Sequence, residues 1–315
     1  MWGAAFAHLL AERGHEVAVL DASPAVVDAL SGAAAEDCAG QRSDGRIKAF
    51  SVAAGAASLA EASLIVVAVP SRAFAAAVRD LPGSSPVLIL TKGLDPGSGR
   101  RLSRLIESRP VAVLSGPNFA EEIAAGLPAA AVVASEDPEI AAWIQVEASS
   151  ATFRVYVNSD LAGVELCGAV KNVVALAAGA VDGLGLGDNA KAAVMTRGLA
   201  EMTRLGVACG ARADTFAGLA GMGDLVATCW HAHGRNRRAG ELVGRGVPPE
   251  QAAEQIGTVE GMVTAPILHE LASGLGVELP ITEAVCTVLS GGDVRELAVE
   301  LMGRRPTEEW SATSA

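Results

Sequence analysis

The sequence predicts an α/β protein in which a doubly wound, mostly parallel sheet is followed by an all-helical C-terminal domain. Over the first half of the chain, short apolar segments alternate with helical ones, which is typical of a parallel sheet covered on both faces. After residue 158 the strand pattern stops, and helical segments separated by glycines follow. A chain of 315 residues is also long for a single hydrophobic core. We therefore expect two domains, residues 1–157 and residues 158–315.

The expected elements of the first domain follow one another at the spacing of strand–helix units. A helix over residues 1–13 ends at Gly14, because glycine is favoured just after a helix. Strands are expected at residues 16–20, 64–69, 87–90, 111–114, 129–134 and 153–157. Helices are expected between them, from residue 23 and at residues 71–79, 100–107, 120–125 and 138–147. In the second domain we expect helices at residues 160–181, 189–205, 215–219, 237–244, 249–256, 264–273 and 281–290.

Composition and charge exclude several classes of protein. The net charge of −12 argues against nucleic acid or an anionic membrane as the main partner. The five cysteines form no CxxC pair, so we expect neither a disulfide framework nor a metal site, and we expect a reducing, cytoplasmic location. The longest apolar run, residues 173–181, is far shorter than the ~20 residues that span a bilayer, so no membrane insertion is expected.

Gly3 lies near the start of the first expected helix, and Asp21 closes the strand that follows it. In a dinucleotide-binding unit, Gly3 corresponds to the third glycine of GxGxxG, and Asp21 to the acid that holds the adenosine ribose about 20 residues later. The alternative is that Asp21 only caps the helix that begins near Ser23. A strand and two further glycines should precede Gly3, and we expect them upstream of a misplaced start, because without them the sheet has unpaired edges.

Polar residues follow each of the next expected strands. Lys92 lies between a buried strand and Gly93, and Gly116 and Asn118 follow the strand at residues 111–114. In open α/β sheets, ligands bind outside the carboxyl ends of the strands. These residues therefore predict a ligand site at that edge.

Lys171 lies in a long helix of small residues in the middle of the chain. Its neighbours three and four positions away are Cys167, Gly168, Val174 and Ala175, none of which is acidic. Such a lysine either reaches water from a buried face or lies desolvated in a cleft, where its pKa falls and it can carry protons.

The second domain contains two further polar clusters. One ends in Asp224, and the other is Gly234, Arg235 and Asn236 at the start of an expected helix. Free backbone N–H groups and a guanidinium at a helix start can bind an anion, although an exposed basic helix start has the same sequence pattern. His231 and His233 are two residues apart, which suits neither one helix face nor a metal site, and we expect both to face solvent.

Several motifs in one order make the sequence similar to a known family along essentially its whole length. They are SGPNFAEE (115–122), ELCGAVKN (165–172), GLAGMGDL (218–225), GRNRR (234–238), VEG (259–261) and ELPIT (278–282). The chain resembles the bacterial NAD(P)-dependent glycerol-3-phosphate dehydrogenases, which have a Rossmann-like domain and a helical domain. The resemblance implies interconversion of dihydroxyacetone phosphate and sn-glycerol 3-phosphate, which feeds phospholipid synthesis.

The resemblance also implies residue roles, with Lys171 as the proton acceptor. The substrate site would be lined by Lys92, Gly116, Asn118, Lys171, Asp224, Gly234, Arg235 and Asn236. The residues expected at the NAD or NADP cofactor are Trp2, Gly3, Asp21, Lys92, Ala120, Arg235, Thr258 and Glu260.

The chain departs from the family at several of these positions. Gly234 replaces the usual serine, Thr258 replaces a valine, and Met1 stands where a small loop residue is expected. Asp21 is followed by Ala22 instead of a basic residue that would read a 2′-phosphate, which favours NAD. The expected partner is a small phosphorylated substrate, and a homodimer is left open.

Two alternatives compete with this interpretation. A related two-domain reductase of another hydroxy acid would share the sheet, the helical domain and a lysine, but it would not need the cluster at Gly234. A catalytically inactive paralogue that binds a phosphorylated metabolite would explain the missing start of the glycine loop.

Overall fold

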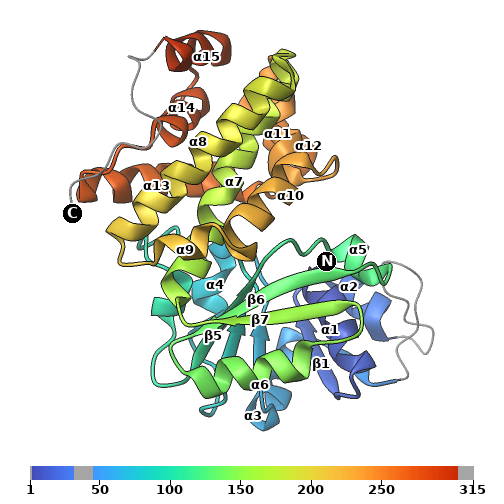
Figure 1. Cartoon of the computed structure of the whole chain (residues 1–315). Coiled ribbons are helices and arrows are strands. Elements are labelled where there is room, and N and C mark those ends of the chain that lie inside the picture. The colour runs from blue at the N-terminus through green and yellow to red at the C-terminus, as the bar shows by residue number, and fades with distance from the viewer. Residues whose placement is uncertain (1, 32–44, 304–315) are drawn as a thin grey trace.

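The computed structural model of the protein describes residues 2–31 and 45–303. An N-terminal α/β domain lies below a bundle of C-terminal helices in the view of Figure 1. The prediction for Met1 lies outside the described residues.

The N-terminal domain contains two sheets. Its strands are β1 (Val17–Asp21), β2 (Ile47–Ser51), β3 (Ile65–Val67), β4 (Val87–Ile89), β5 (Val111–Ser115), β6 (Ala129–Ser135) and β7 (Phe153–Asn158). Its helices are α1 (Trp2–Glu12), α2 (Pro24–Ser31), α3 (Val52–Glu61), α4 (Ser71–Val78), α5 (Ala120–Ala124) and α6 (Pro138–Ala148). The larger sheet has the order β3-β4-β5-β6-β7, and the smaller one pairs β1 with β2. In the described part of the chain, no strand joins the two sheets.

The larger sheet is parallel except at one pair. β6 runs antiparallel to β5, with Ser115 opposite Val132, and β7 is parallel to β6. The amino ends of β6 and β7 therefore lie at the edge of the sheet where β5 ends. That edge carries the polar residues that follow β4 and β5.

The hydrophobic core covers both faces of this sheet. Adjacent residues of a strand point to opposite faces, and in β4 Leu88 and Ile89 belong to different clusters. The cluster around Leu88 includes Phe6 of α1, and the cluster around Ile89 includes Leu166 of the C-terminal domain. The second domain thus packs directly on the sheet.

The C-terminal domain consists of helices joined by short loops, with no strand among its described residues after β7. Its helices are α7 (Leu161–Leu184), α8 (Gly187–Ala208), α9 (Ala213–Phe216), α10 (Asp224–Trp230), α11 (Arg235–Gly244), α12 (Pro249–Ile256), α13 (Glu260–Leu275), α14 (Pro280–Leu289) and α15 (Val294–Met302), with a π-helical turn at Leu219–Gly223. α7 is the one described helix that is long and apolar enough to cross a membrane, but 89% of its most apolar window is buried inside the fold. This burial is typical of a core helix.

Glycines allow α7 and α11 to cross at very short distance. A Cβ added at Gly240 would overlap the carbonyl oxygen of Leu176, and a Cβ at Gly244 would overlap the backbone of α7 one turn later. Gly179 and Gly183 of α7 lie equally close to the backbone of α11. The spacing of four residues on each helix keeps the glycines on one face, so the start of α11 is held against α7.

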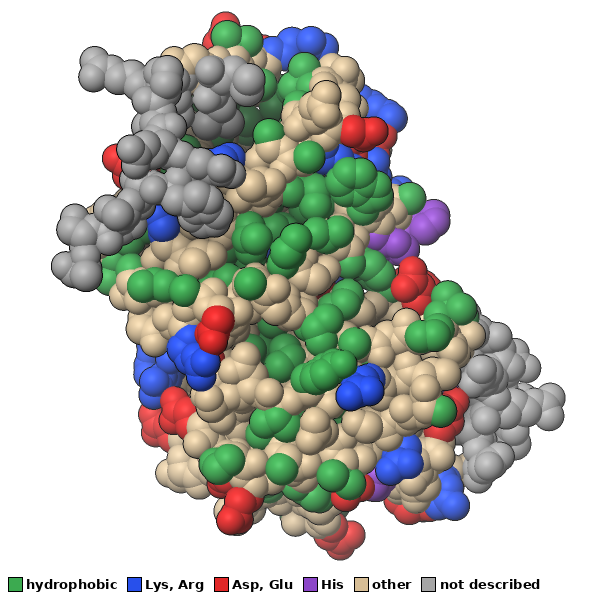
Figure 2. Space-filling view, viewed as in Figure 1, with side chains coloured by type: hydrophobic (Ala, Val, Ile, Leu, Met, Phe, Trp, Pro, Cys, Tyr) green, Lys and Arg blue, Asp and Glu red, His purple; other side chains and the backbone are tan. Residues whose placement is uncertain are grey.

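Apolar side chains are exposed along one face of α10 and the π-helical turn before it. Met222, Val226 and Trp230 follow one another at intervals of four residues, and each is at least 41% exposed. Figure 2 shows apolar side chains gathered across this face, where the two domains meet.

The structure corrects several predicted elements. Residues 100–107 were expected to be helical but form only a 3₁₀ turn at Leu102–Leu105. β2, α3 and α15 were not predicted. β2 is only five residues long and is stabilised by its parallel pairing with β1, which no local pattern reveals. The expected helix at residues 215–219 is replaced by α9 and the π-helical turn.

Candidate active site

Two lysines from different domains meet on one buried carboxylate. The Nζ atom of Lys171 lies 2.6 Å from Oδ1 of Asp224, and the Nζ atom of Lys92 lies 2.6 Å from Oδ2. Lys171 and Asp224 are buried, whereas the side chain of Lys92 is 19% exposed. We call these three residues the lysine–aspartate–lysine cluster. The acidic partner that Lys171 lacks on its own helix therefore comes from α10.

The ends of β4 and β5 shape the space around Lys92. Lys92 donates a hydrogen bond of 3.1 Å to the carbonyl oxygen of Gly116, just after β5. Gly93 and Gly116 have φ values of 141° and 136°, which L-residues rarely adopt. A Cβ at Gly116 would lie 3.0 Å from the carbonyl oxygen of Ala130, and a Cβ at Gly168 of α7 would lie 3.3 Å from Cγ of Lys92. Glycines therefore let the sheet edge and α7 approach this lysine.

Asp224 is oriented by the π-helical turn that precedes it. Gly221 in this turn packs so closely that a Cβ would overlap the backbone carbonyl of Phe216, and π-helical turns are frequent at functional sites. One helical turn after Asp224, the Oγ1 atom of Thr228 donates 3.2 Å to Asp224 Oδ1 and accepts 2.8 Å from Nζ of Lys171. The carboxylate is thus held by three polar side chains.

Burial and charge set the pKa values in the lysine–aspartate–lysine cluster. Burial lowers the pKa of Lys171 from 10.5 to about 8; the negative charge of Asp224 opposes this change, and the positive charge of Lys92 adds to it. Burial would raise the pKa of Asp224, but the positive charges of Lys171 and Lys92 outweigh it, so its pKa is lowered. The positive charge of Lys92 therefore favours a neutral Lys171.

Two side chains at the end of β5 and in the loop after it keep polar atoms that are buried and have no partner among the described residues. They are Oγ of Ser115 and Oδ1 of Asn118. The Nδ2 atom of Asn118 donates 3.2 Å to the carbonyl oxygen of Ala130, which fixes the amide. Buried polar atoms without partners are costly, so these atoms are suited to hydrogen bonds with a ligand.

The start of α11 lies beside the cluster. Asn236 donates 2.9 Å to Oδ1 of Asn172, the residue after Lys171, and accepts 2.8 Å from the backbone N–H of Gly261. Gly234 is the N-cap and provides no side-chain cap for the helix. Arg235 is exposed and forms no ion pair with any residue that the structure describes. Uncapped N–H groups beside a free guanidinium can bind a phosphate group.

The first residues of α1 fit a dinucleotide-binding unit. A Cβ at Gly3 would lie 2.8 Å from Cβ of Ala68, so helix and strand segment pack at a distance that requires glycine. Trp2 packs on Phe6 and Phe153, and its Nε1 atom is buried without a partner among the described residues. These residues therefore fit the helix start of a nicotinamide-dinucleotide unit.

The other predicted cofactor residues come from both domains. Asp21 ends β1 and accepts 2.8 Å from the backbone N–H of Ser23 in the turn before α2 (Pro24–Ser31); because this N–H lies outside the helix, the contact is a turn contact and not the helix cap weighed as its alternative. Glu260 starts α13 and accepts from the N–H and the Oγ of Ser71 at 3.2 and 2.6 Å, which joins the two domains beside Gly93. Ala120 begins α5, and Thr258 is half-buried shortly before α13.

Some polar partners were missed by the sequence analysis. Thr228 lies four residues after Asp224 on a helix, which is a recognisable spacing, whereas Asn172 and Ser71 are found only through contacts between distant segments. The expectation that His231 faces solvent is wrong. Its ring is half-buried and stacks on Phe119, because loops of the two domains meet there.

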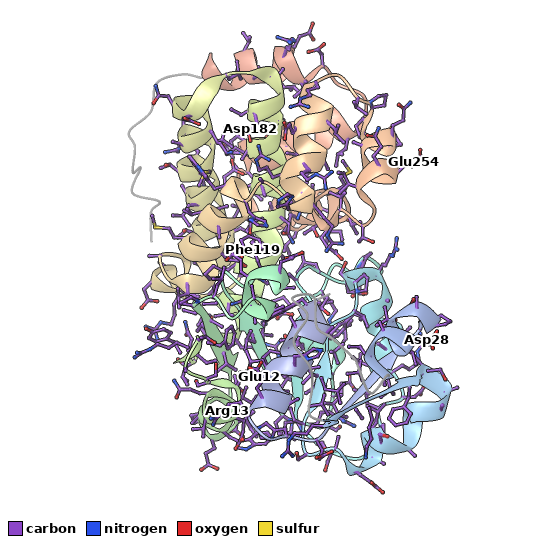
Figure 3. The ribbon with its side chains drawn as sticks, turned by 90° about the vertical axis from the view of Figure 1, so that its right-hand side faces the viewer. Glu12, Arg13, Asp28, Phe119, Asp182 and Glu254 are labelled. Atoms are coloured by element: carbon purple, nitrogen blue, oxygen red, sulfur yellow. The ribbon has the colours of Figure 1, made fainter. Side chains whose placement is uncertain are left out.

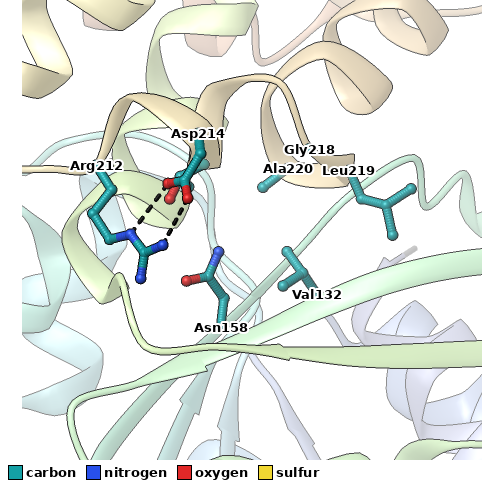
Figure 4. A pocket seen from close by; sticks show the side chains of 8 residues that line it. Val132, Asn158, Arg212, Asp214, Gly218, Leu219 and Ala220 are labelled. Atoms are coloured by element: carbon teal, nitrogen blue, oxygen red, sulfur yellow. Dashed lines mark hydrogen bonds and ion pairs between the residues drawn. The ribbon is translucent and has the colours of Figure 1, made fainter.

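A separate pocket of about 160 Å³ lies between the domains (Figure 4). It is lined by Val132, Asn158, Arg212, Asp214, Thr215, Gly218, Leu219 and Ala220. None of the three residues of the lysine–aspartate–lysine cluster lines it. The guanidinium of Arg212 is already paired with Asp214 in this pocket.

A dinucleotide-type sheet joined to a helical domain that carries a buried lysine of lowered pKa defines a two-domain nicotinamide-dependent dehydrogenase. Residues 1–141 match the N-terminal profile of the NAD-dependent glycerol-3-phosphate dehydrogenases, and residues 160–300 match the C-terminal profile. The chain belongs to the NAD-dependent glycerol-3-phosphate dehydrogenase family, which confirms the resemblance inferred from its motifs.

Two bacterial relatives match it over nearly their full length. The glycerol-3-phosphate dehydrogenase [NAD(P)+] of Moorella thermoacetica is 44% identical over 98% of this chain and 95% of the relative. The protein of the same name from Clostridium acetobutylicum is 40% identical over 98% of this chain and 96% of the relative. The crystal structure of the glycerol-3-phosphate dehydrogenase of Coxiella burnetii superimposes with a TM-score of 0.89, at 36% identity, over 96% of each chain.

Proposed function

We propose that this enzyme interconverts dihydroxyacetone phosphate and sn-glycerol 3-phosphate with NAD or NADP as the hydride carrier. The observation that carries the proposal is the lysine–aspartate–lysine cluster, in which a buried amine with a lowered pKa lies beside an uncapped helix start. The relatives carry the name of this activity.

Lys171 moves the proton. The nicotinamide, when bound, supplies or receives the hydride at C2 of the substrate. In the direction of reduction, Nζ of Lys171 donates a proton to the oxygen on C2, and in oxidation the neutral amine accepts it. With a pKa of about 8, the amine is close enough to neutral pH to do both. Asp224 and Thr228 hold it in place through hydrogen bonds of 2.6 and 2.8 Å.

The phosphate would bind at the start of α11. Arg235 supplies a guanidinium, and Gly234 and Asn236 supply backbone N–H groups. In a protein of net charge −12, such a local site is needed to hold an anion. The free Oδ1 of Asn118 and Oγ of Ser115 are suited to the hydroxyl groups of the substrate.

The cofactor would extend along the sheet edge from Asp21 to Glu260. Trp2, Gly3 and Ala120 lie at helix starts on this edge, and Lys92, Arg235 and Thr258 complete the predicted set. The oxygen of Asp21 that Ser23 does not engage can accept bonds from ribose hydroxyls, which favours NAD over NADP. We place the enzyme in the cytoplasm, and a homodimer is a hypothesis that sedimentation velocity would test.

Steady-state kinetics on the full chain test the function. Dihydroxyacetone phosphate should oxidise NADH, and unphosphorylated dihydroxyacetone should have a far lower kcat/KM. Lys171→Met should lower kcat by ~10²-fold or more, because it removes the proton carrier. Lys48→Met, at an exposed lysine of β2, is the matched control and should keep full activity.

Two results would refute this proposal. Equal kcat/KM for the two ketones would refute the phosphate site. Binding of dihydroxyacetone phosphate without any turnover would instead support an inactive, metabolite-binding paralogue.

A further inference from the structure

An aromatic contact joins the two domains next to the proposed substrate site. The rings of Phe119 and His231 stack with their centroids 3.9 Å apart and their planes 21° apart. Phe119 precedes α5 in the N-terminal domain, and His231 ends α10 in the C-terminal domain. Figure 3 shows Phe119 at the junction between the sheet and the helical bundle.

Both residues are directly connected to groups that line the proposed site. Phe119 follows Asn118, whose Oδ1 is buried without a partner among the described residues. The carbonyl oxygen of His231 accepts 3.1 Å from the N–H of Gly234, the N-cap of α11. His231 therefore begins the turn that leads into the phosphate-binding helix start.

The other contacts of this turn lie within the C-terminal domain: the N–H of His231 donates 2.9 Å to the carbonyl oxygen of Ala227, and Nη1 of Arg237 donates 3.5 Å to that of Ala232. The side chain of Asn236 anchors the first turn of α11 to α7 and α13, but residues 232 and 233 are exposed. His233 touches His231 only edge-on, with centroids 5.7 Å apart. Among the described residues, the stack on Phe119 is the ring contact that ties this turn to the N-terminal domain.

We propose that the stack of His231 on Phe119 is a positioning contact for the substrate phosphate. It holds the turn before α11 against the loop after β5, so that Arg235 and the N–H groups of the helix start face Asn118 across one site. This inference rests on the proposed function. The inference gives Phe119 and His231, which lie outside the predicted site, a role in substrate affinity and no role in proton transfer.

The test compares variants that remove or keep the stack. His231→Ala removes the imidazole, and an aromatic pair of this kind contributes enough for a roughly 3- to 10-fold rise in KM for dihydroxyacetone phosphate. kcat and KM for NADH should stay within about twofold, because the lysine–aspartate–lysine cluster is untouched. His231→Phe keeps a stacking ring and should restore the KM. His233→Ala, at the exposed neighbour, is the matched control and should match the unmutated enzyme.

A second pair of measurements identifies the contact itself. Phe119→Leu should raise KM as much as His231→Ala, and the double variant should raise it no further, because both changes break the same interaction. Melting temperatures within about 2 °C of the unmutated enzyme would exclude loss of folding. Isothermal titration calorimetry with inorganic phosphate should show the same order of affinities without any turnover.

The failure of this inference is distinct from that of the proposed function. If the unmutated enzyme does not reduce dihydroxyacetone phosphate, the proposed function is wrong, and phosphate affinities still test the stack. An unchanged KM and phosphate affinity in His231→Ala would overturn the inference. A rise of equal size in His231→Phe, or a fall in kcat alone, would overturn it as well.

Discussion

Replacing Asp224 by asparagine should shift the pH dependence of glycerol 3-phosphate oxidation. In the structure, Asp224 is the counter-charge of both Lys171 and Lys92. Oxidation requires a neutral Lys171 to accept the proton, so log kcat/KM should rise with pH and level off above the pKa of about 8. The reverse reaction requires the charged amine, and its kcat/KM should fall above the same pH.

The direction of the shift follows from the charges around Lys171. Burial and Lys92 both lower its pKa, and Asp224 opposes them. In Asp224→Asn the opposing charge is lost, so the midpoint should move below 8 by about 1–3 pH units. Lys92→Met removes a like charge and should move the midpoint above 8. Roughly one amine in ten is neutral at pH 7 with a pKa of about 8, against roughly one in 3,000 at 10.5.

The assay is initial-rate oxidation of glycerol 3-phosphate between pH 5.5 and about 10, with saturating cofactor. Both variants also touch the substrate site, so absolute rates should fall, but the midpoint does not depend on them. Thr228→Val removes a hydrogen bond from Lys171 without changing charge and is the control for the midpoint. A midpoint that rises in Asp224→Asn, or that moves the same way in both charge variants, would contradict the assignment of Lys171 as the proton carrier.

Three further substitutions test the cofactor site, the crossing of α7 and α11, and a buried carboxyl group. Asp21→Ser with Ala22→Arg should reverse a preference for NADH, because the pair removes a carboxylate from the ribose site and supplies a bidentate partner for a 2′-phosphate. The ratio of kcat/KM values with NADH and NADPH measures this preference. Gly240→Ala should destabilise the fold by about 1–3 kcal/mol and raise KM, because its Cβ overlaps the Leu176 carbonyl. Glu201→Gln should flatten the pH dependence of stability, because burial raises the pKa of Glu201 from 4.5 to about 7.

The sign for Glu201 follows from its raised pKa. The folded protein binds the proton of the Glu201 carboxyl group more tightly than the unfolded chain does. The resulting contribution to the free energy of unfolding is complete below pH 4.5 and is lost as pH rises through about 7, at up to about 1.4 kcal/mol per pH unit. Urea unfolding at several pH values measures this pH dependence, and an equal slope of unfolding free energy against pH in both proteins would contradict the assignment.

For Gly240, the control is Gly274→Ala in α13, whose Cβ meets no atom within 4 Å and should not destabilise the fold. A kcat/KM that favours NADPH in the unmutated enzyme would refute the placement of Asp21.

The sequence by itself predicted most of the elements and the sheet edge at which we propose the site. Apolar runs alternating with helical patterns predicted the sheet, and the glycines and polar residues after β4 and β5 predicted a ligand site at that edge. These are local signals, because strand and helix periodicity and turn residues act over a few positions. The motifs also identified the family, since several in one order are far more specific than a single glycine loop.

Only the tertiary structure decided which side chains meet. Lys171 and Asp224 are separated by 53 positions, and no periodicity relates the small-residue helix α7 to the turn that aims Asp224. The same is true of His231. Its spacing of two residues from His233 predicted that it faces solvent, but its ring stacks on Phe119 of the other domain. It is also true of β2, which is stabilised by pairing with β1. Contacts of this kind depend on how helices and strands pack across the chain. A buried lysine needs its counter-charge from such packing, because none of its helical neighbours carries one.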